Sequence, residues 1–143
     1  MAEENLVTFN FEDIKIPGFD GLNTREWIHH AINNEGGVLA NLQFIFCNDE
    51  FLSEINRKYL NHDSLTDIIA FNYNDEYNGI AGDIFISYER VAENAKRYNV
   101  TTLHELHRVI IHGVLHLLGY NDKTATQKSQ MRAKENYYLN LLS

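Results

Sequence analysis

The sequence TTLHELHRVIIHGVLHLLGYND, residues 101–122, contains the pattern that decides the fold. From Thr101 onward its apolar residues recur at the spacing of one face of an α-helix. His112 and His116 lie one turn apart on that helix, at about 40° from each other around its axis. Because two such imidazoles can approach one cation, H-x-x-x-H on a helix is a recurring half of a zinc site.

The end of this helix supplies a third candidate ligand. Gly119 is placed to adopt the left-handed conformation that ends a helix and turns the chain back. Asp122 follows just past that turn, where its carboxylate can reach the two histidines. Two nitrogens and one oxygen leave a fourth position open for water, as in catalytic rather than structural zinc sites. The alternative is a pair of ordinary exposed or hydrogen-bonded histidines on an amphipathic helix.

Length and composition indicate a single domain over residues 1–143, large enough to bury a core. No apolar run is long enough to span a membrane, and the start MAEENLVTFNF does not have the pattern of a signal peptide. Cys47 is the sole cysteine, which excludes an intramolecular disulfide and cysteine-rich zinc modules. A reducing cytoplasm suits this composition.

The charge distribution is uneven along the chain. The net charge of −8 argues against a generic nucleic-acid binder, and no DNA partner is expected. Residues 1–83 hold 15 acidic and 4 basic side chains, whereas residues 84–143 hold 5 acidic and 8 basic ones. A basic face near the histidines, suited to a polyanion, is therefore compatible with the sequence. The alternative is that these basic residues are solvated helix faces: Lys96, Arg97, Lys128, Arg132 and Lys134.

Hydrophobic periodicity and capping residues predict four strands and five helices. The expected strands are Val7–Phe11, Val38–Cys47, Thr66–Phe71 and Ala81–Ser87, the last two pairing as antiparallel neighbours. The expected helices start at Asn23 or Thr24, at Asn48 or Asp49, at Ser87, at Thr101 and at a Thr124–Gln127 capping box, the last running through Leu141. The order β-α-β-α-β-β-α-α-α predicts the α+β class, with a single mixed sheet of about four strands covered by about five helices.

The run from His112 to Tyr120 closely resembles the signature of the YbeY family, bacterial rRNA maturation factors described as metal-dependent endoribonucleases. TDIIAF at 66–71 resembles the family's T-D-V-L-S-F strand, GDIFIS at 82–87 its G-D-I-x-I-S strand, and Asn56–Tyr59 its N-x-x-Y. The resemblance implies a zincin-like metal-binding helix and a zinc-dependent, single-strand-specific endoribonuclease. It also implies a role in small-subunit rRNA 3′ end processing, ribosome maturation and quality control, with ribosomal RNA and the small ribosomal subunit as partners.

The family's metal site is a three-histidine set, H-x-x-x-H-x-x-x-x-x-H. His112 and His116 match its first two positions, and the third falls on Asp122, because no histidine follows His116 in this chain. A carboxylate oxygen is an accepted zinc ligand. The expected site is therefore one Zn²⁺ held by His112, His116 and Asp122, with a bound water less acidic than beside three neutral imidazoles.

A second departure concerns an arginine that the family commonly carries directly after the tyrosine of N-x-x-Y, and that is implied to work with the phosphate. Leu60 occupies this position. Arg57 and Lys58 lie close by and are candidates to substitute for it, Arg57 as a catalytic residue beside His112 and His116. The alternative is that both are exposed helix residues. The loss leaves open a non-catalytic ribosome-assembly factor in which the metal holds the C-terminal turn together.

Gly113 stands where zincin metallopeptidases have the glutamate of H-E-x-x-H, so the usual general base is missing. A metal-dependent hydrolase of peptides or small molecules is for that reason a third, disfavoured hypothesis. His104 is a weak candidate for moving protons, since it lies about 80° from His112 around the helix. His107 lies about 140° from His112 and so points well away from the metal-binding face. Asp67 and Asp83 are expected to shape the site or the strand ends.

Overall fold

The computed structural model describes residues 6–60 and 66–142, with Leu60 described by its backbone alone. The elements are β1 (Val7–Phe11), α1 (Gly21–Asn34), β2 (Leu39–Cys47), α2 (Asp49–Ile55), the π-helical turn η2 (Asn56–Leu60), β3 (Ile68–Asn72), the 3₁₀ turn η3 (Asn74–Glu76), β4 (Ile80–Ser87), α3 (Tyr88–Tyr98), α4 (Thr102–Leu117) and α5 (Ala125–Leu139). The predicted α+β class and the predicted order of strands and helices are both confirmed.

The four strands form one mixed sheet in the order β1-β2-β4-β3. β1, β2 and β4 are parallel neighbours, whereas β3 runs antiparallel to β4. The predicted pairing of the last two strands is therefore confirmed, with Ile68 opposite Ile86 and Asn72 opposite Gly82. β3 is an edge strand, so one of its sides has no neighbour in this sheet.

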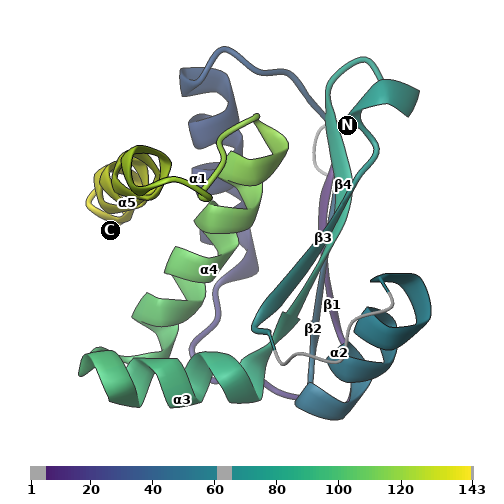
Figure 1. The fold of residues 1–143 in the computed structure, drawn as a ribbon, viewed down its shortest axis with the longest axis vertical. Helices are drawn as coiled ribbons and strands as arrows, with labels where there is room; N and C mark the ends of the chain where they lie inside the picture. Colours follow the sequence, from purple (N-terminus) through teal and green to yellow (C-terminus); the bar gives the residue numbers. More distant parts are fainter. Residues whose placement is uncertain (1–5, 61–65, 143) are drawn as a thin grey trace.

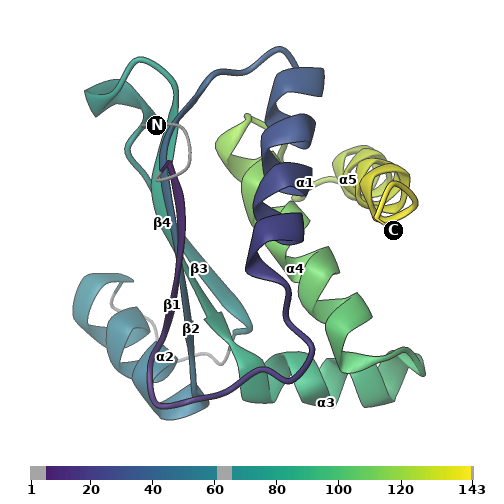
Figure 2. The same cartoon turned by 180° about the vertical axis from the view of Figure 1, so that it is seen from behind.

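Helices cover both faces of the sheet (Figures 1 and 2). α1 and α4 pack on one face and α2 on the other, while α5 lies outside α4, away from the sheet. β2 is buried on both sides, as expected of a central parallel strand: Leu42 and Phe44 face the main core, and Cys47 packs with Leu52 in the smaller core under α2. Within the described residues, no helix is long and apolar enough to cross a membrane.

Side-chain N-caps begin α4 and the helices around it. The predicted N-caps Ser87, Thr101 and Thr124 are confirmed, and Thr124 forms a complete capping box with Gln127. The predicted start of α1 at Asn23 or Thr24 is wrong, because Asp20 caps the helix one turn earlier and accepts a hydrogen bond from the Asn23 amide. At the other end of the chain, α5 ends at Leu139 rather than at Leu141.

Candidate metal centre

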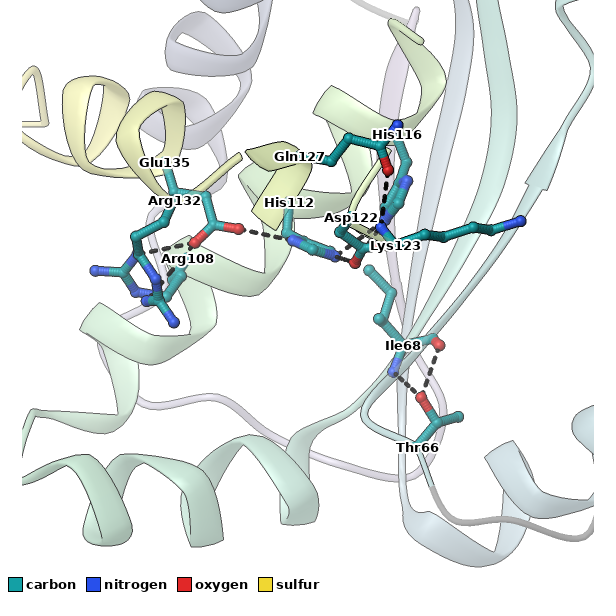
Figure 3. A network of polar contacts seen from close by, with 10 residues as sticks. All are labelled: Thr66, Ile68, Arg108, His112, His116, Asp122, Lys123, Gln127, Arg132 and Glu135. Atoms are coloured by element: carbon teal, nitrogen blue, oxygen red, sulfur yellow. Dashed lines mark hydrogen bonds and ion pairs between the residues drawn. The ribbon is translucent and has the colours of Figure 1, made fainter. Parts of the chain in front are cut away.

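His112 and His116 project from the last two turns of α4 and meet above the helix surface (Figure 3). Their ring centroids are 4.6 Å apart, and their Nε2 atoms are separated by 3.1 Å. Both side chains are partly open to solvent, with 24% of His112 and 32% of His116 exposed. The predicted spacing of one turn therefore brings two ring nitrogens to the same point, at the surface.

The turn after α4 directs Asp122 back toward these rings. Gly119 adopts a φ of 108°, and its amide bonds to the His116 carbonyl while the Tyr120 amide bonds to that of Leu115. These two hydrogen bonds form a Schellman motif, whose left-handed position suits glycine. Oδ2 of Asp122 then lies 3.3 Å from Nε2 of His112 and 3.4 Å from Nε2 of His116.

The residues that follow Asp122 fix it from the other side. Oε1 of Gln127 accepts hydrogen bonds from the amides of Lys123 and Thr124, each at 3.1 Å, and the Gln127 amide donates to the Thr124 hydroxyl. Asp122 thus lies between the end of one helix and the capping box of the next, which leaves its backbone little freedom.

Three donor atoms so arranged match a zinc ion. Tetrahedral zinc, with bonds of about 2.0–2.2 Å to nitrogen and oxygen, has its ligand atoms about 3.3–3.6 Å apart. The three separations here are 3.1, 3.3 and 3.4 Å, close to one face of that tetrahedron. Two imidazoles and a carboxylate are a donor set of catalytic zinc sites, and the partial exposure of all three leaves room for a fourth ligand.

Glu135 on α5 orients His112 from behind. Its Oε2 lies 2.7 Å from Nδ1 of His112, and its Oε1 accepts a hydrogen bond of 2.8 Å from Arg108. Burial raises the pKa of Glu135, but these two partners outweigh it, so that the pKa is lowered and the carboxylate stays charged. A charged carboxylate makes Nδ1 the protonated nitrogen of His112, which leaves the Nε2 lone pair directed toward Asp122 and His116.

Sequence reasoning did not identify Glu135, although a signal was present. Met131, Glu135 and Tyr138 recur at helical spacing, and all three are buried on the inner face of α5. A glutamate at a core position of an amphipathic helix needs a partner, and here the partners are His112, a candidate metal ligand, and Arg108.

Glu35 holds the turn of the site against two other helices. Its carboxylate accepts hydrogen bonds from the hydroxyls of Tyr120 (2.6 Å) and Tyr138 and from Nζ of Lys134 (3.0 Å). Tyr120 belongs to the turn that leads to Asp122, whereas Lys134 and Tyr138 belong to α5. Because Glu35 follows the last residue of α1, this one side chain joins α1, the turn and α5.

Two hollows flank the three candidate ligands. The first, which we call the α5-side hollow, has a volume of about 380 Å³ and lies among α3, α4, α5 and the start of β3. The second, the β3-side hollow, has a volume of about 460 Å³ and runs along β3 past His116. Asp67, Ile68, His112 and Asp122 line both, so the hollows meet at the candidate ligands.

Gly113 is required by packing rather than by the site. A Cβ atom there would lie 3.0 Å from Cδ1 of Ile68 and 3.1 Å from Cδ1 of Ile84, closer than most real contacts. The absence of the zincin glutamate therefore has a steric cause, since α4 touches the sheet at this residue.

The structure places the other residues named from the sequence as follows. Asp67 lines both hollows, and burial raises the pKa of its carboxyl. Asp83, on β4, accepts a hydrogen bond of 3.2 Å from the hydroxyl of Tyr73. His104 is exposed, whereas His107 packs edge-on against Trp27. Of these four residues, Asp67 alone is part of the described lining of the two hollows.

Arg57 and Lys58 are exposed on η2, next to Leu60, whose side chain lies outside the described residues. Neither residue is part of the described lining of the two hollows. Nζ of Lys58 lies 5.4 Å from the ring centre of Tyr59, and so contacts the aromatic face. The catalytic role expected for Arg57 stays a prediction.

Together, the layered α+β fold and a helix whose two histidines meet a carboxylate define the class of protein: an α+β protein with a candidate single-metal centre, whose donor set is one that metal-dependent hydrolases use. The family model described as endoribonuclease YbeY matches residues 9–143. The chain belongs to this endoribonuclease family.

Similar proteins agree with this assignment. The chain is 47% identical over 139 residues to the endoribonuclease YbeY of Amoebophilus asiaticus, covering 97% of this chain and 94% of that protein. It is 43% identical over 141 residues to the one of Cytophaga hutchinsonii, covering 99% and 98%. The solution structure of TM1509 from Thermotoga maritima has the same fold, with a TM-score of 0.67 and 24% identity over 95% of this chain and 88% of that one.

Proposed function

We propose that this protein is a zinc-dependent endoribonuclease that cleaves single-stranded RNA. We further propose that it acts in the cytoplasm on small-subunit ribosomal RNA, in 3′ end processing, ribosome maturation and quality control, together with the small ribosomal subunit. The relatives' name supports RNA cleavage, and the ribosomal role rests on the family resemblance.

One observation carries the metal-dependent part of the proposal. The Nε2 atoms of His112 and His116 and Oδ2 of Asp122 lie within 3.4 Å of one another, at the junction of two hollows. Three donors at this spacing repel or compete for protons unless a cation lies among them. Zinc bound there supplies a Lewis acid for a phosphate oxygen and lowers the pKa of the attacking hydroxyl group.

Other residues of the protein orient the three candidate ligands. Glu135 keeps the proton of His112 on Nδ1, and Arg108 holds Glu135 in place through the hydrogen bond to Oε1. Glu35 fixes Tyr120, which keeps the backbone two residues before Asp122 against α1. These contacts place the three ligands before any substrate arrives, which lowers the cost of binding the metal in the reactive geometry.

The two hollows suit an unpaired strand. A chain of nucleotides laid across His112 and Asp122 has one hollow on either side of the bond at the metal. Lys128 and Arg132 are exposed on α5 at the α5-side hollow, where they can contact phosphates. The sequence-based idea of a basic face near the histidines is consistent with these two residues.

Hydrolysis of peptides is a poorer account of the site. Gly113 provides no general base, and its contacts with Ile68 and Ile84 leave no room for one. A metal-stabilised assembly factor without catalytic activity is the second candidate, because Leu60 replaces the arginine that the family commonly has.

A comparison of three proteins tests the proposal: the wild type, His116→Ala, and His30→Ala as a control with an exposed histidine on α1. Each is purified, its zinc content is measured, and cleavage of single-stranded RNA is assayed beside duplex RNA. We expect one zinc per chain and cleavage of single strands by the wild type and His30→Ala, and neither by His116→Ala. Equal cleavage by all three would refute the proposal, whereas one zinc without cleavage would support the assembly factor.

A further inference from the structure

The α5-side hollow contains a buried carboxylate that the site described so far does not use. Glu105, on α4, lies two turns before His112 on the same helix face and is 5% exposed. It is part of the lining of the hollow, and its carboxylate makes no hydrogen bond or ion pair with any residue in the described ranges 6–60 and 66–142. The carboxylate oxygens are not among the fully buried unpartnered atoms of the described residues, so they are open to the hollow and free to accept hydrogen bonds from a molecule in it.

The neighbouring arginine does not supply that partner. Arg108, one turn further along α4, donates to Oε1 of Glu135 at 2.8 Å and to Oδ1 of Asn136 at 2.9 Å. Its guanidinium is therefore committed to α5. Burial raises the pKa of Glu105, and the positive charge of Arg108 offsets this only in part.

An exposed aromatic ring forms another wall of the same hollow. Tyr98, at the end of α3, is 56% exposed and lines the hollow together with Lys128 and Arg132. An exposed tyrosine beside basic side chains is a common platform on which an unpaired base stacks while its phosphates are neutralised. The volume of about 380 Å³ is in the range of small-ligand sites, and His112 and Asp122 are part of the same lining.

We propose that the α5-side hollow binds one unpaired nucleobase of the RNA next to the scissile phosphate, with Tyr98 stacking on the base and Glu105 accepting hydrogen bonds from its edge. This inference rests on the proposed function and adds a base preference to it. A carboxylate has two acceptor oxygens and no donor. Guanine presents two adjacent hydrogen-bond donors, N1–H and the N2 amino group. Adenine and cytosine each present one donor group beside an acceptor. Uracil presents one donor, which lies between two acceptors. The preferred base is therefore guanine.

Binding of mononucleotides to the zinc-loaded protein tests the preference directly. The guanosine, adenosine, cytidine, uridine and inosine monophosphates carry the same phosphate, so any contact with the metal is common to all five. We expect guanosine monophosphate to bind about tenfold tighter than the others. Inosine monophosphate lacks only the N2 amino group, and should lose most of that advantage. Equal binding of all five, or no binding at millimolar concentration, would overturn the proposal.

Two variants test the proposed contacts of Glu105 and Tyr98 with the base. Glu105→Gln replaces one acceptor by a donor with nearly the same shape, and should remove the preference for guanine while other nucleotides bind as before. Tyr98→Ala should weaken the binding of every nucleotide by about tenfold, because an aromatic ring stacks on any base. Glu54→Gln and Tyr77→Ala are matched controls at exposed positions away from the hollow, and should bind like the wild type. A preference for guanine that survives in folded Glu105→Gln would refute the role of this carboxylate.

Cleavage measured on the same preparations separates the two proposals. RNA cleaved by the zinc protein without any guanine preference in binding would overturn the base site alone. Selective binding of guanosine monophosphate by a protein that cleaves no RNA would overturn the nuclease function and leave the base site intact.

Discussion

Oε2 of Glu135 on α5 lies 2.7 Å from Nδ1 of His112 on α4, on the side of the ring opposite Asp122. Carboxylate–histidine–metal chains of this kind fix the orientation of the ring and make it a stronger ligand. The last helix, which contributes none of the three candidate ligands, therefore supports the candidate metal centre through Glu135.

Removal of this carboxylate should weaken metal binding. We expect Glu135→Ala to raise the dissociation constant for zinc by about 10–100-fold, because His112 loses its orienting partner. Glu135→Gln keeps an oxygen acceptor for Nδ1–H and should have a smaller effect. Competition with a chromophoric chelator measures both constants, with Glu93→Ala, an exposed glutamate on α3, as the control. An unchanged constant in folded Glu135→Ala would show that the contact does not influence the metal.

Loss of the Glu35 contacts should destabilise the fold. Glu35→Ala leaves the buried hydroxyl of Tyr138 and the amine of Lys134 without their acceptor, and we expect the free energy of unfolding to fall by about 1–3 kcal/mol. Tyr138→Phe removes one donor to Glu35 and the acceptor of the Asn34 side-chain amide, but leaves Tyr120 and Lys134 bound to Glu35, and should cost less. Urea denaturation of the two variants and the wild type measures the difference. Equal midpoints would mean that the network adds no stability.

The same network predicts a dependence on pH. Burial raises the pKa of Glu35, but the hydrogen bonds from Tyr120, Tyr138 and Lys134 outweigh it, and the pKa in the folded state is lowered. A lowered pKa means that the unfolded chain takes up the proton first, so the stabilisation is complete above the ordinary glutamate pKa of about 4.3 and is lost as pH falls below it. The gap in unfolding free energy between the wild type and Glu35→Gln should therefore narrow from pH 6 toward pH 3. A gap that is constant over this range would contradict the assigned cause.

Substitution of Gly113 should destabilise the protein without creating a peptidase. Alanine is the better helix former, yet a Cβ atom at this position would lie 3.0–3.3 Å from side-chain atoms of Ile68 and Ile84. We therefore expect the free energy of unfolding of Gly113→Ala to be about 1–3 kcal/mol lower than that of the wild type. Gly113→Glu restores the zincin pattern in the sequence only, and its free energy of unfolding should fall further, because its side chain is larger. Thermal unfolding and a casein cleavage assay check the two expectations. A stable Gly113→Glu protein with peptidase activity would show that the contact with the sheet is not restrictive.

The sequence was sufficient for the parts of the site that are local in the chain. The spacing of His112 and His116, the left-handed turn at Gly119 and the capping box at Thr124 all depend on residues within a few positions of one another. Backbone geometry then decides where Asp122 lies. The strand and helix order followed in the same way from periodicity and caps.

The contacts that support the site could not be read from spacing, because they join distant segments. Glu35 and Tyr138 are separated by 103 residues, and Glu135 reaches His112 across 23. Glu105 and Glu135 did carry a signal, since each is an acidic residue on the buried face of its helix. What each one faces depends on how α3, α4 and α5 pack, which the pattern of one helix does not contain.

Titration of the metal-free protein with zinc tests the central claim most directly. RNA cleavage under single-turnover conditions is measured after each addition, in parallel with Asp122→Ala. Activity should be absent in the chelated protein, rise in proportion to zinc and stop rising at one equivalent per chain, while Asp122→Ala should show no such break. Cleavage by the zinc-free wild type, or an identical titration curve for Asp122→Ala, would contradict a catalytic metal held by His112, His116 and Asp122.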